Sequence, residues 1–402
     1  MATIPYNPKK VLWGLLGDTA KDRYNAAKKR MNEVEECLSK LEWQGADTSY
    51  ARDALYGLDY WVSCTTDVEK VDAALDHLNR AVNCKNPPNA LAQDSDGSFG
   101  PGTDVWFLKL DRSTDQLLAR EWPWPRNPNF LECISNPVRM VTYLLDLCWS
   151  DLARCGRDNR KELNLAVSVI SRLVLKGGQR GYLSGPGFYP AFEQFVRDWQ
   201  DPATGFFGVT YITDEKGNQV RTTDLSLTFH MARYTPHLVR WWPKLIDTLL
   251  TMKKGTYPQG WLDSGKTMTD HNNYDVVELF HLGWLRMVPR QRREASAAVA
   301  ELLNWCVDDC SGSVKEDGSL RSPDKSDPIP DSFYYAASFL DTVGYFDRKK
   351  RFWTADSVPG DPIKIRQGMI EELKKFNPYY TEVDDTLARL GAAEHPWTSA
   401  IL

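Results

Sequence analysis

The sequence has little that would place it in or across a membrane. Its apolar stretch at residues 11–16 is far shorter than the roughly 20 residues that a membrane-spanning helix needs. The first ten residues do not show the order of positive charge and then apolar run that marks a secretory signal. We therefore expect a cytoplasmic protein without a membrane span.

An excess of positive charge is also missing. The chain of 402 residues carries 49 Lys and Arg against 54 Asp and Glu, a formal net charge of −5. Its most basic stretches, 28–30 and 348–351, are short and lie near acidic residues. Nucleic-acid binding needs a Lys- and Arg-rich face that releases counterions from phosphate. The composition therefore argues against a nucleic-acid partner.

The eight cysteines form no Cys-x-x-Cys pair, and no histidine follows them at zinc-finger spacing. Cys306 and Cys310 are four residues apart, so on a helix they would share one face and could supply two metal ligands. Because further ligands are not evident, we interpret the cysteines as free thiols of a reducing compartment. Nothing in the sequence requires a metal or an organic cofactor.

Glycine-centred turns recur along the chain. Their lead glycines are Gly97, Gly205, Gly260 and Gly318, with gaps of 108, 55 and 58 residues, so that the first gap is about twice the others. A unit of that length is typical of two helices with their loops. An amphipathic helix tends to precede each turn, and a second helix that starts with Asp, Ser, Thr or Asn follows it. This pattern predicts repeated helical hairpins.

Six hairpins account for most of the chain. We predict their paired helices at 19–41 with 48–62, 66–84 with 135–154, 160–199 (broken near Gly177) with 222–233, 236–252 with 273–286, 291–309 with 331–344, and 363–375 with 382–392. Alternating outer and inner helices of this kind close as an all-α (α/α)6 toroid. We expect residues 1–402 to form a single domain of this type.

One segment does not fit the hairpin repeat. Residues 85–132 are too many for a plain loop. Within them, apolar runs at 105–110 and 116–122 flank a polar turn, which predicts a small β-hairpin. We interpret this segment as an insertion that caps one end of the ring.

The segment at 199–208 (WQDPATGFFG), followed by Asp224 and Thr228, resembles the repeat of terpenoid cyclases and protein prenyltransferases. In that repeat a Gln and a Gly-aromatic turn precede an inner helix with an acidic start. Many carbohydrate-active lyases, hydrolases and epimerases are similar (α/α)6 toroids. The resemblance covers about residues 40–345 and implies the toroid fold. The Asp-x-Asp-Asp acid motif of class II terpenoid cyclases is missing from the sequence.

The densest group of chemically versatile side chains lies at the predicted start of an inner helix. It consists of His271, Asn272, Tyr274, Asp275 and Glu278. Histidine or tyrosine can remove or deliver a proton, and an amide can neutralise a carboxylate, which together suits β-elimination from a uronate. The alternative is that the polar residues cap the helix and that Tyr274 packs in the core.

Further candidates lie at the starts of other inner helices. Arg139 would supply positive charge for the carboxylate of a uronate. Asp224 and Asp331 are candidate acids or bases, because glycoside hydrolysis needs two carboxyl groups about 5–10 Å apart. Both aspartates have the alternative role of helix N-cap. His230 is either a substrate contact or a hydrogen-bonded core residue.

Aromatic side chains complete the predicted site. The sequence holds 15 Trp, and aromatic residues make up 12% of the chain, enough to line a large cavity with rings. Sugar rings and polyene chains both stack on aromatic faces. We therefore predict substrate contacts at Trp106, Phe207, Trp261 and Tyr335, with core packing as the alternative for each.

Three functions are compatible with these features. The first is a polysaccharide or oligosaccharide lyase or a glycoside hydrolase, which acts on a glycan or small-molecule substrate by acid/base chemistry in the toroid cavity. The second is a terpenoid or other polyene cyclase, and the third is a non-enzymatic toroid that binds a peptide or protein. A polar, acid-lined cavity would favour a sugar, and a dry aromatic one would favour a polyene.

Overall fold

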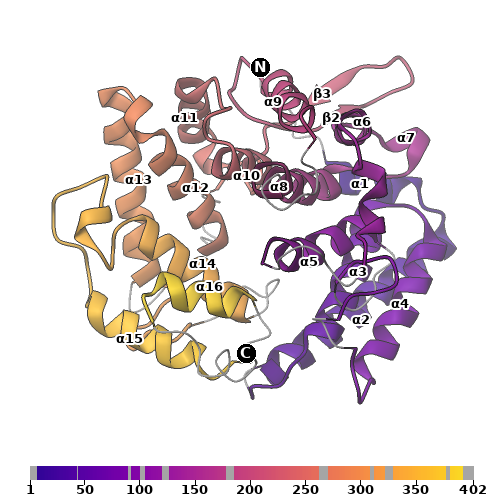
Figure 1. The fold of residues 1–402 in the computed structure, drawn as a ribbon, viewed down its shortest axis with the longest axis horizontal. Helices are drawn as coiled ribbons and strands as arrows, with labels where there is room; N and C mark the ends of the chain where they lie inside the picture. The colour runs from indigo at the N-terminus through magenta and orange to yellow at the C-terminus, as the bar shows by residue number, and fades with distance from the viewer. Residues whose placement is uncertain are drawn as a thin grey trace. The chain divides into compact units, whose positions relative to one another are not determined.

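The computed structural model describes residues 7–42, 44–88, 92–99, 105–119, 126–177, 185–261, 270–307, 312–321, 329–376 and 381–392. Most of these residues are helical (Figure 1), which confirms the all-α prediction. The chain divides into unit 1, which is Met1–Leu38, Thr48–Gln200 and Phe207–Val239, and unit 2, which is Ser39–Asp47, Asp201–Phe206 and Arg240–Leu402. Closure into one toroid domain stays a prediction.

Unit 1 contains the first ten α-helices, apart from the last residues of α2. They are α1 (Pro8–Leu15), α2 (Asp18–Glu42), α3 (Ser49–Cys64), α4 (Val68–Val82), α5 (Trp106–Ala119), α6 (Pro137–Leu147), α7 (Leu152–Cys155), α8 (Arg160–Gly177), α9 (Phe188–Trp199) and α10 (Leu225–Tyr234), with a 3-10 helix η1 (Asn129–Ile134). The predicted break near Gly177 is confirmed, because α8 ends there. The predicted helix 135–154 is shorter than expected and ends at Leu147, after which the chain extends into a strand.

Unit 2 contains the remaining helices. They are α11 (Trp242–Thr251), η3 (Met252–Lys254), α12 (Asp270–Gly283), η4 (Trp284–Arg286), α13 (Pro289–Val307), α14 (Ile329–Thr342), η5 (Arg348–Lys350), α15 (Pro362–Leu373) and α16 (Thr381–Arg389). The helices predicted in the last three hairpins are all present. No helix among the residues described in either unit combines the length and the apolar character needed to cross a bilayer.

The small β element exists, but its predicted position is wrong. Residues 106–119 form α5, because Phe107, Leu110 and Leu117 are buried at spacings of three and seven residues, which suit a helix and not a strand. Residues 120–122 of the predicted hairpin lie outside the described chain. The sheet instead joins β1 (Trp149–Asp151), β2 (Thr210–Ile212) and β3 (Gln219–Arg221), with β1 parallel and β3 antiparallel to β2.

Two of the predicted glycine turns have the same construction. Asp96 Oδ1 accepts hydrogen bonds from the Ser98 N–H and hydroxyl at 3.0 and 2.6 Å, and Asp317 Oδ1 accepts the same pair from Ser319 at 3.0 and 2.7 Å. The glycine between each pair has a left-handed backbone, with φ of 84° at Gly97 and 80° at Gly318. The sequence repeat is therefore a structural repeat at these turns.

Two pairs of neighbouring helices, one pair in each unit, pack in parallel. In unit 2, α12 contacts α14 through His271 with Tyr335 and through Glu278 with Thr342, two pairs that are each 64 residues apart. In unit 1, α8 contacts α10 through Arg160 with Asp224 and through Asn164 with Ser226, which are 64 and 62 residues apart. A nearly constant offset means that the two helices of a pair run in the same direction. The hairpin predicted at 160–199 with 222–233 is therefore wrong for α8 and α10, because the chain breaks at Gly177 and α9 lies between these two helices in sequence.

Candidate active site

Helix α12 lies in the centre of unit 2. Residues 273–277 and 279–280 are buried, and 271, 272 and 278 are half-buried. The helix packs against α11, α13 and α14. Burial around nearly the whole circumference is unusual for a helix whose first turns are polar, because surface helices bury one stripe only. The predicted polar group at 271–278 is therefore an interior feature of this unit.

Aromatic rings surround the first turn of α12. The imidazole of His271 stacks on the ring of Tyr335, with centroids 4.3 Å apart and an interplanar angle of 6°. The ring of Tyr257 lies 5.6 Å from the same imidazole. Tyr274 meets Tyr334 edge to face at 6.2 Å, and Tyr334 lies 5.5 Å from Tyr335. The five rings form one contiguous group, in which four members are phenols.

Carboxylates lie in the same part of unit 2. Asp275 is fully buried and accepts a hydrogen bond of 2.9 Å from the hydroxyl of Tyr257. Glu278 is half-buried and accepts one of 3.2 Å from the hydroxyl of Thr342. Asp331 is half-buried in the first turn of α14. Tyr257 thus connects the ring group to an acid, a role that its loop position did not indicate in the sequence.

Asn273 is the amide that the structure singles out. It is fully buried, and neither Nδ2 nor Oδ1 has a hydrogen-bond partner in the described chain. An unsatisfied buried polar group costs about 1–3 kcal/mol. Groups in this state are often reserved for a ligand or a water. The neighbouring Asn272, named from the sequence, is only half-buried; adjacency in an Asn-Asn pair is the one signal that could have indicated Asn273.

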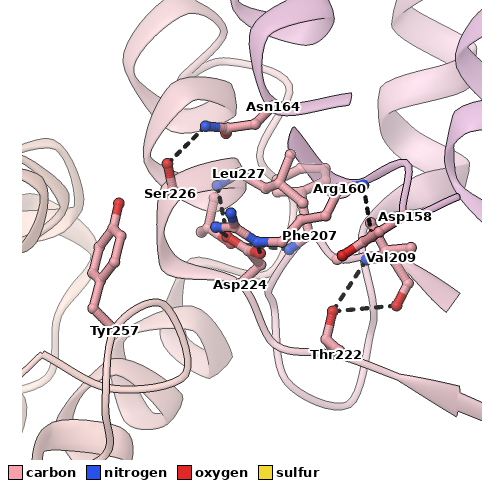
Figure 2. Close-up of polar contacts among 12 residues, drawn as sticks. Asp158, Arg160, Asn164, Phe207, Val209, Thr222, Asp224, Ser226, Leu227 and Tyr257 are labelled. Carbon is pink, nitrogen blue, oxygen red and sulfur yellow. Dashed lines mark hydrogen bonds and ion pairs between the residues drawn. The ribbon is translucent and has the colours of Figure 1, made fainter. Parts of the chain in front are cut away.

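Asp224 has a structural role in unit 1. It is fully buried as the N-cap of α10, where Oδ1 accepts a 3.1 Å hydrogen bond from the Leu227 N–H. The guanidinium of Arg160 donates to both carboxylate oxygens, at 3.0 Å through Nη2 (Figure 2). Thr228, one turn later, accepts a hydrogen bond from the Phe207 N–H. These contacts agree with the N-cap interpretation of Asp224 and occupy both of its oxygens.

A second buried acid lies beside this ion pair. Asp158 accepts hydrogen bonds from the Arg160 N–H at 3.0 Å and from the Tyr211 hydroxyl at 2.9 Å. Burial raises the pKa of the Asp158 carboxyl despite these donors, and the charge of Asp224 adds to the increase. Arg160 therefore contacts both acids: its backbone N–H donates to Asp158, and its guanidinium donates to Asp224.

The remaining predicted residues of unit 1 lie at different places in it. His230 is half-buried and stacks on Tyr234 with centroids 6.1 Å apart. Phe207 is fully buried, with its ring 5.0 Å from that of Trp199. Trp106 lies on α5, and its indole N–H donates to the Phe130 carbonyl at 2.8 Å. Arg139 is exposed in the first turn of α6 and forms an ion pair with Glu132.

Trp261, in unit 2, is buried, with only 1% of its surface exposed. Its indole N–H donates to the Leu249 carbonyl at 2.8 Å, and its ring packs edge to face on Phe280. Phe207 and Trp261 therefore serve as core residues of their units, the alternative given above for each. Tyr335 is the predicted aromatic that contacts a candidate catalytic side chain.

A metal centre is not evident in the described part of the chain. Within it, no three His, Cys, Asp or Glu side chains come together as a metal site requires. Cys306 is buried, whereas Cys310 lies outside the described residues.

Comparisons of this chain with family models, with curated proteins and with solved structures found no match.

Proposed function

We propose that this protein is a carbohydrate-active enzyme, a glycan lyase or a glycoside hydrolase, whose acid/base chemistry takes place at the N-terminal ends of α12 and α14. The observation that carries the proposal is a chain of contacts among four side chains. The imidazole of His271 lies against the rings of Tyr335 and Tyr257, and the Tyr257 hydroxyl donates a hydrogen bond to the carboxylate of Asp275. Proton transfer at a glycosidic oxygen or a sugar carbon uses these groups.

Each residue has a definite part in the proposed chemistry. His271 exchanges the proton, and Tyr335 holds its ring plane by stacking. Tyr274 delivers or removes the second proton. Asp275, oriented by the Tyr257 hydroxyl, fixes the local charge, and Asn273 binds a polar substituent of the sugar. This last role explains why the buried amide has no hydrogen-bond partner in the described part of the chain.

The toroid fold belongs to this proposal. It is supported by the parallel packing of α12 and α14, which are both predicted as inner helices, because the inner helices of a closed ring of hairpins must all run in one direction. The parallel pair of α8 with α10 fits the same ring with α8 as an inner helix in place of an outer one. The matching turns at Gly97 and Gly318 support the same repeat. In such a ring the N-terminal ends of the inner helices gather at one mouth of the cavity, where a site can form.

A polyene cyclase is less well supported. It would use an aromatic, dry lining, whereas Phe207 and Trp261 are occupied in the cores of their units. The half-buried residues of α12 and α14 include His271, Asn272, Glu278 and Asp331, which are polar. Polar side chains at these positions fit a hydroxylated substrate.

The test is an activity screen of the full chain on glycans. Uronate-containing polysaccharides are followed by absorbance of the unsaturated product of a lyase, and neutral polysaccharides by the release of reducing ends. The proposal expects turnover in one of the two assays and its loss in His271→Gln. The matched control is His237→Gln. His237 is exposed, forms a hydrogen bond with the Tyr189 hydroxyl, and is not part of the proposed site. Absence of turnover in both assays, or equal turnover in both variants, contradicts the proposal.

A further inference from the structure

Helices α3, α5 and α8 of unit 1 share an apolar contact and each has an accessible polar stripe. Tyr60 of α3 packs on Phe107 of α5 with centroids 4.7 Å apart, and Leu165 of α8 joins the same cluster. On α8, residues 161, 164 and 172 are among the few that are not buried, and their spacing of three and eight residues places them on one side. The stripe on α3 contains Asp53, Tyr56 and Asp59, three residues apart.

Charges on these stripes are paired between helices. Asp53 of α3 forms an ion pair of 2.6 Å with Arg112 of α5, and Asp59 of α3 forms one with Lys161 of α8. Asp111 of α5 lies 3.8 Å from Arg172 of α8. The set consists of three carboxylates and three cationic groups, so its net charge is zero. The side chains of these pairs are between 15% and 45% exposed, so each pair is partly accessible to a bound molecule.

Tyr56 lies among these charges. Its ring centroid is 4.5 Å from Nζ of Lys161. Its surface is 37% exposed, yet desolvation raises the pKa of its hydroxyl. Lys161 and Arg112 lower that pKa, and the charges of Asp111 and Asp59 raise it further. The two observations agree because part of the Tyr56 side chain reaches solvent while neighbouring side chains pack closely around the rest. Such a residue can pack against the ring of a bound molecule.

We propose that the charge-paired stripe formed by Asp53, Tyr56, Asp59, Asp111, Arg112, Lys161 and Arg172 binds a neutral oligosaccharide. A sugar hydroxyl donates one hydrogen bond and accepts others, so a surface that alternates carboxylates with ammonium and guanidinium groups satisfies both needs. Its zero net charge offers no attraction to a phosphate, a polyuronate or a metal cation. Tyr56 supplies an aromatic face for the apolar side of a pyranose.

This inference does not depend on the reaction at α12, because it concerns residues of unit 1 and is tested by binding. The full chain is titrated by calorimetry with cellohexaose, maltohexaose, xylohexaose and mannohexaose, and separately with hexagalacturonate. We expect one or more of the neutral hexasaccharides to bind, with a dissociation constant that changes less than twofold between low and high salt. Binding of hexagalacturonate alone, or of no probe, overturns the proposal.

Variants locate the binding. Lys161→Met and Tyr56→Leu are expected to weaken it at least tenfold. The control Arg23→Met removes an ion pair of 3.0 Å with Asp72 between two other helices of unit 1, and should leave binding unchanged. The exchange Asp59→Lys with Lys161→Asp keeps the ion pair, and thus tests binding where Lys161→Met fails to fold; we expect it to fold and to bind at least tenfold more weakly. If Lys161→Met, Tyr56→Leu and the charge exchange all bind as the wild type does, the sugar binds at another place on the protein and the proposal is overturned.

Binding is also measured in His271→Gln. If this variant still binds the sugar but has lost turnover, the binding site in unit 1 is separate from the active site at α12. If the protein shows turnover but the unit 1 variants leave binding unchanged, the binding site in unit 1 is contradicted, and the proposed active site at α12 is not.

Discussion

Tyr335 lies face to face with His271, its ring centroid 4.3 Å from that of the imidazole. The two residues belong to parallel helices and are 64 positions apart, so that the stack is a direct consequence of how α12 and α14 pack. Stacking on an aromatic face restricts the imidazole to one plane. It thereby fixes the directions in which the two ring nitrogens exchange protons.

The first prediction concerns this stack. We expect Tyr335→Phe to retain it and to keep turnover within a few-fold, whereas Tyr335→Leu should lose about 0.5–1.5 kcal/mol of ring interaction and most of the turnover. Proton NMR gives a readout that needs no substrate. The His271 ring protons should resonate upfield in the wild type and in Tyr335→Phe, and return toward their free positions in Tyr335→Leu. Unshifted signals in the wild type would contradict the stacking.

The second prediction concerns the hydroxyl of Tyr274, which is buried next to Tyr334. Tyr274→Phe removes only that hydroxyl, so turnover should fall about 10²–10⁴-fold if it transfers a proton. The free energy of unfolding should fall by no more than about 0.5–1.5 kcal/mol, the net value of one hydrogen bond.

The control for Tyr274 is Tyr345→Phe. Tyr345 is also buried in unit 2, and its hydroxyl donates to the Pro359 carbonyl at 2.9 Å. Tyr345→Phe should lower the free energy of unfolding about as much as Tyr274→Phe does, but should keep the turnover of the wild type. Equal turnover in the two variants removes Tyr274 from the mechanism.

The third prediction concerns the buried ion pair of Asp224 with Arg160. Asp224→Ala removes the fully buried partner and leaves Arg160, which is 25% exposed and lies near Asp158. We therefore expect a cost between the roughly 1 kcal/mol of a lost N-cap and the roughly 3–5 kcal/mol of a broken, fully buried pair. The matched control is Asp67→Ala at the exposed N-cap of α4, where the side chain accepts a hydrogen bond from the Lys70 N–H at 3.1 Å. Loss of that cap should cost about 1 kcal/mol. Urea unfolding measures both, and similar losses in the two variants would show that the ion pair adds nothing to the cap.

The fourth prediction concerns Gly318. Its φ is 80°, and a Cβ there would lie 2.4 Å from the backbone oxygen of Ile365 on α15. Gly318→Ala should therefore cost at least about 1–3 kcal/mol, the usual strain of a non-glycine residue in such a backbone. Gly14→Ala, in helix α1, meets no atom within 4 Å and should instead stabilise the protein by about 0.4–1 kcal/mol. A stable Gly318→Ala variant would argue against the close approach of this turn to α15.

The fifth prediction concerns acid pH. Hydrogen bonds from the Ser319 hydroxyl and N–H lower the pKa of Asp317. A carboxyl whose pKa is lower in the folded state stabilises the fold at pH values above its unfolded pKa of about 3.9, and this contribution is lost as the pH falls through the folded value. Asp317→Asn should therefore be less stable than the wild type near neutral pH, and the difference should shrink as the pH falls below about 4.

Urea unfolding at several pH values measures this difference. Ser319→Ala serves as the comparison, because it removes one of the two donors and should show a weaker dependence on pH. A gap between Asp317→Asn and the wild type that stays constant from neutral to acid pH would mean that the charge of Asp317 has no part in the turn.

The repeat could be predicted from sequence because it depends on local chemistry. Glycine at 97 and 318 permits a left-handed turn, and the preceding aspartate accepts hydrogen bonds from the residue after it. Helix starts could be predicted for the same reason, as with Asp224, whose carboxylate caps α10. The misplaced β-hairpin shows where this reasoning fails: short apolar runs at 105–110 and 116–122 suit either structure, and packing of Phe107 and Leu110 in the interior favoured the helix.

The sequence by itself determined most of the helices and the polar start of α12, because both follow from side chains close together in the chain. Only the tertiary structure decided which residues meet. It paired His271 with Tyr335, joined Tyr257 to Asp275, and assigned Phe207 and Trp261 to cores. It also left Asn273 buried with no hydrogen-bond partner among the described residues. These relations depend on the register and direction in which helices pack. Register is set by the fit of many apolar side chains at once, and no local pattern along the chain encodes it.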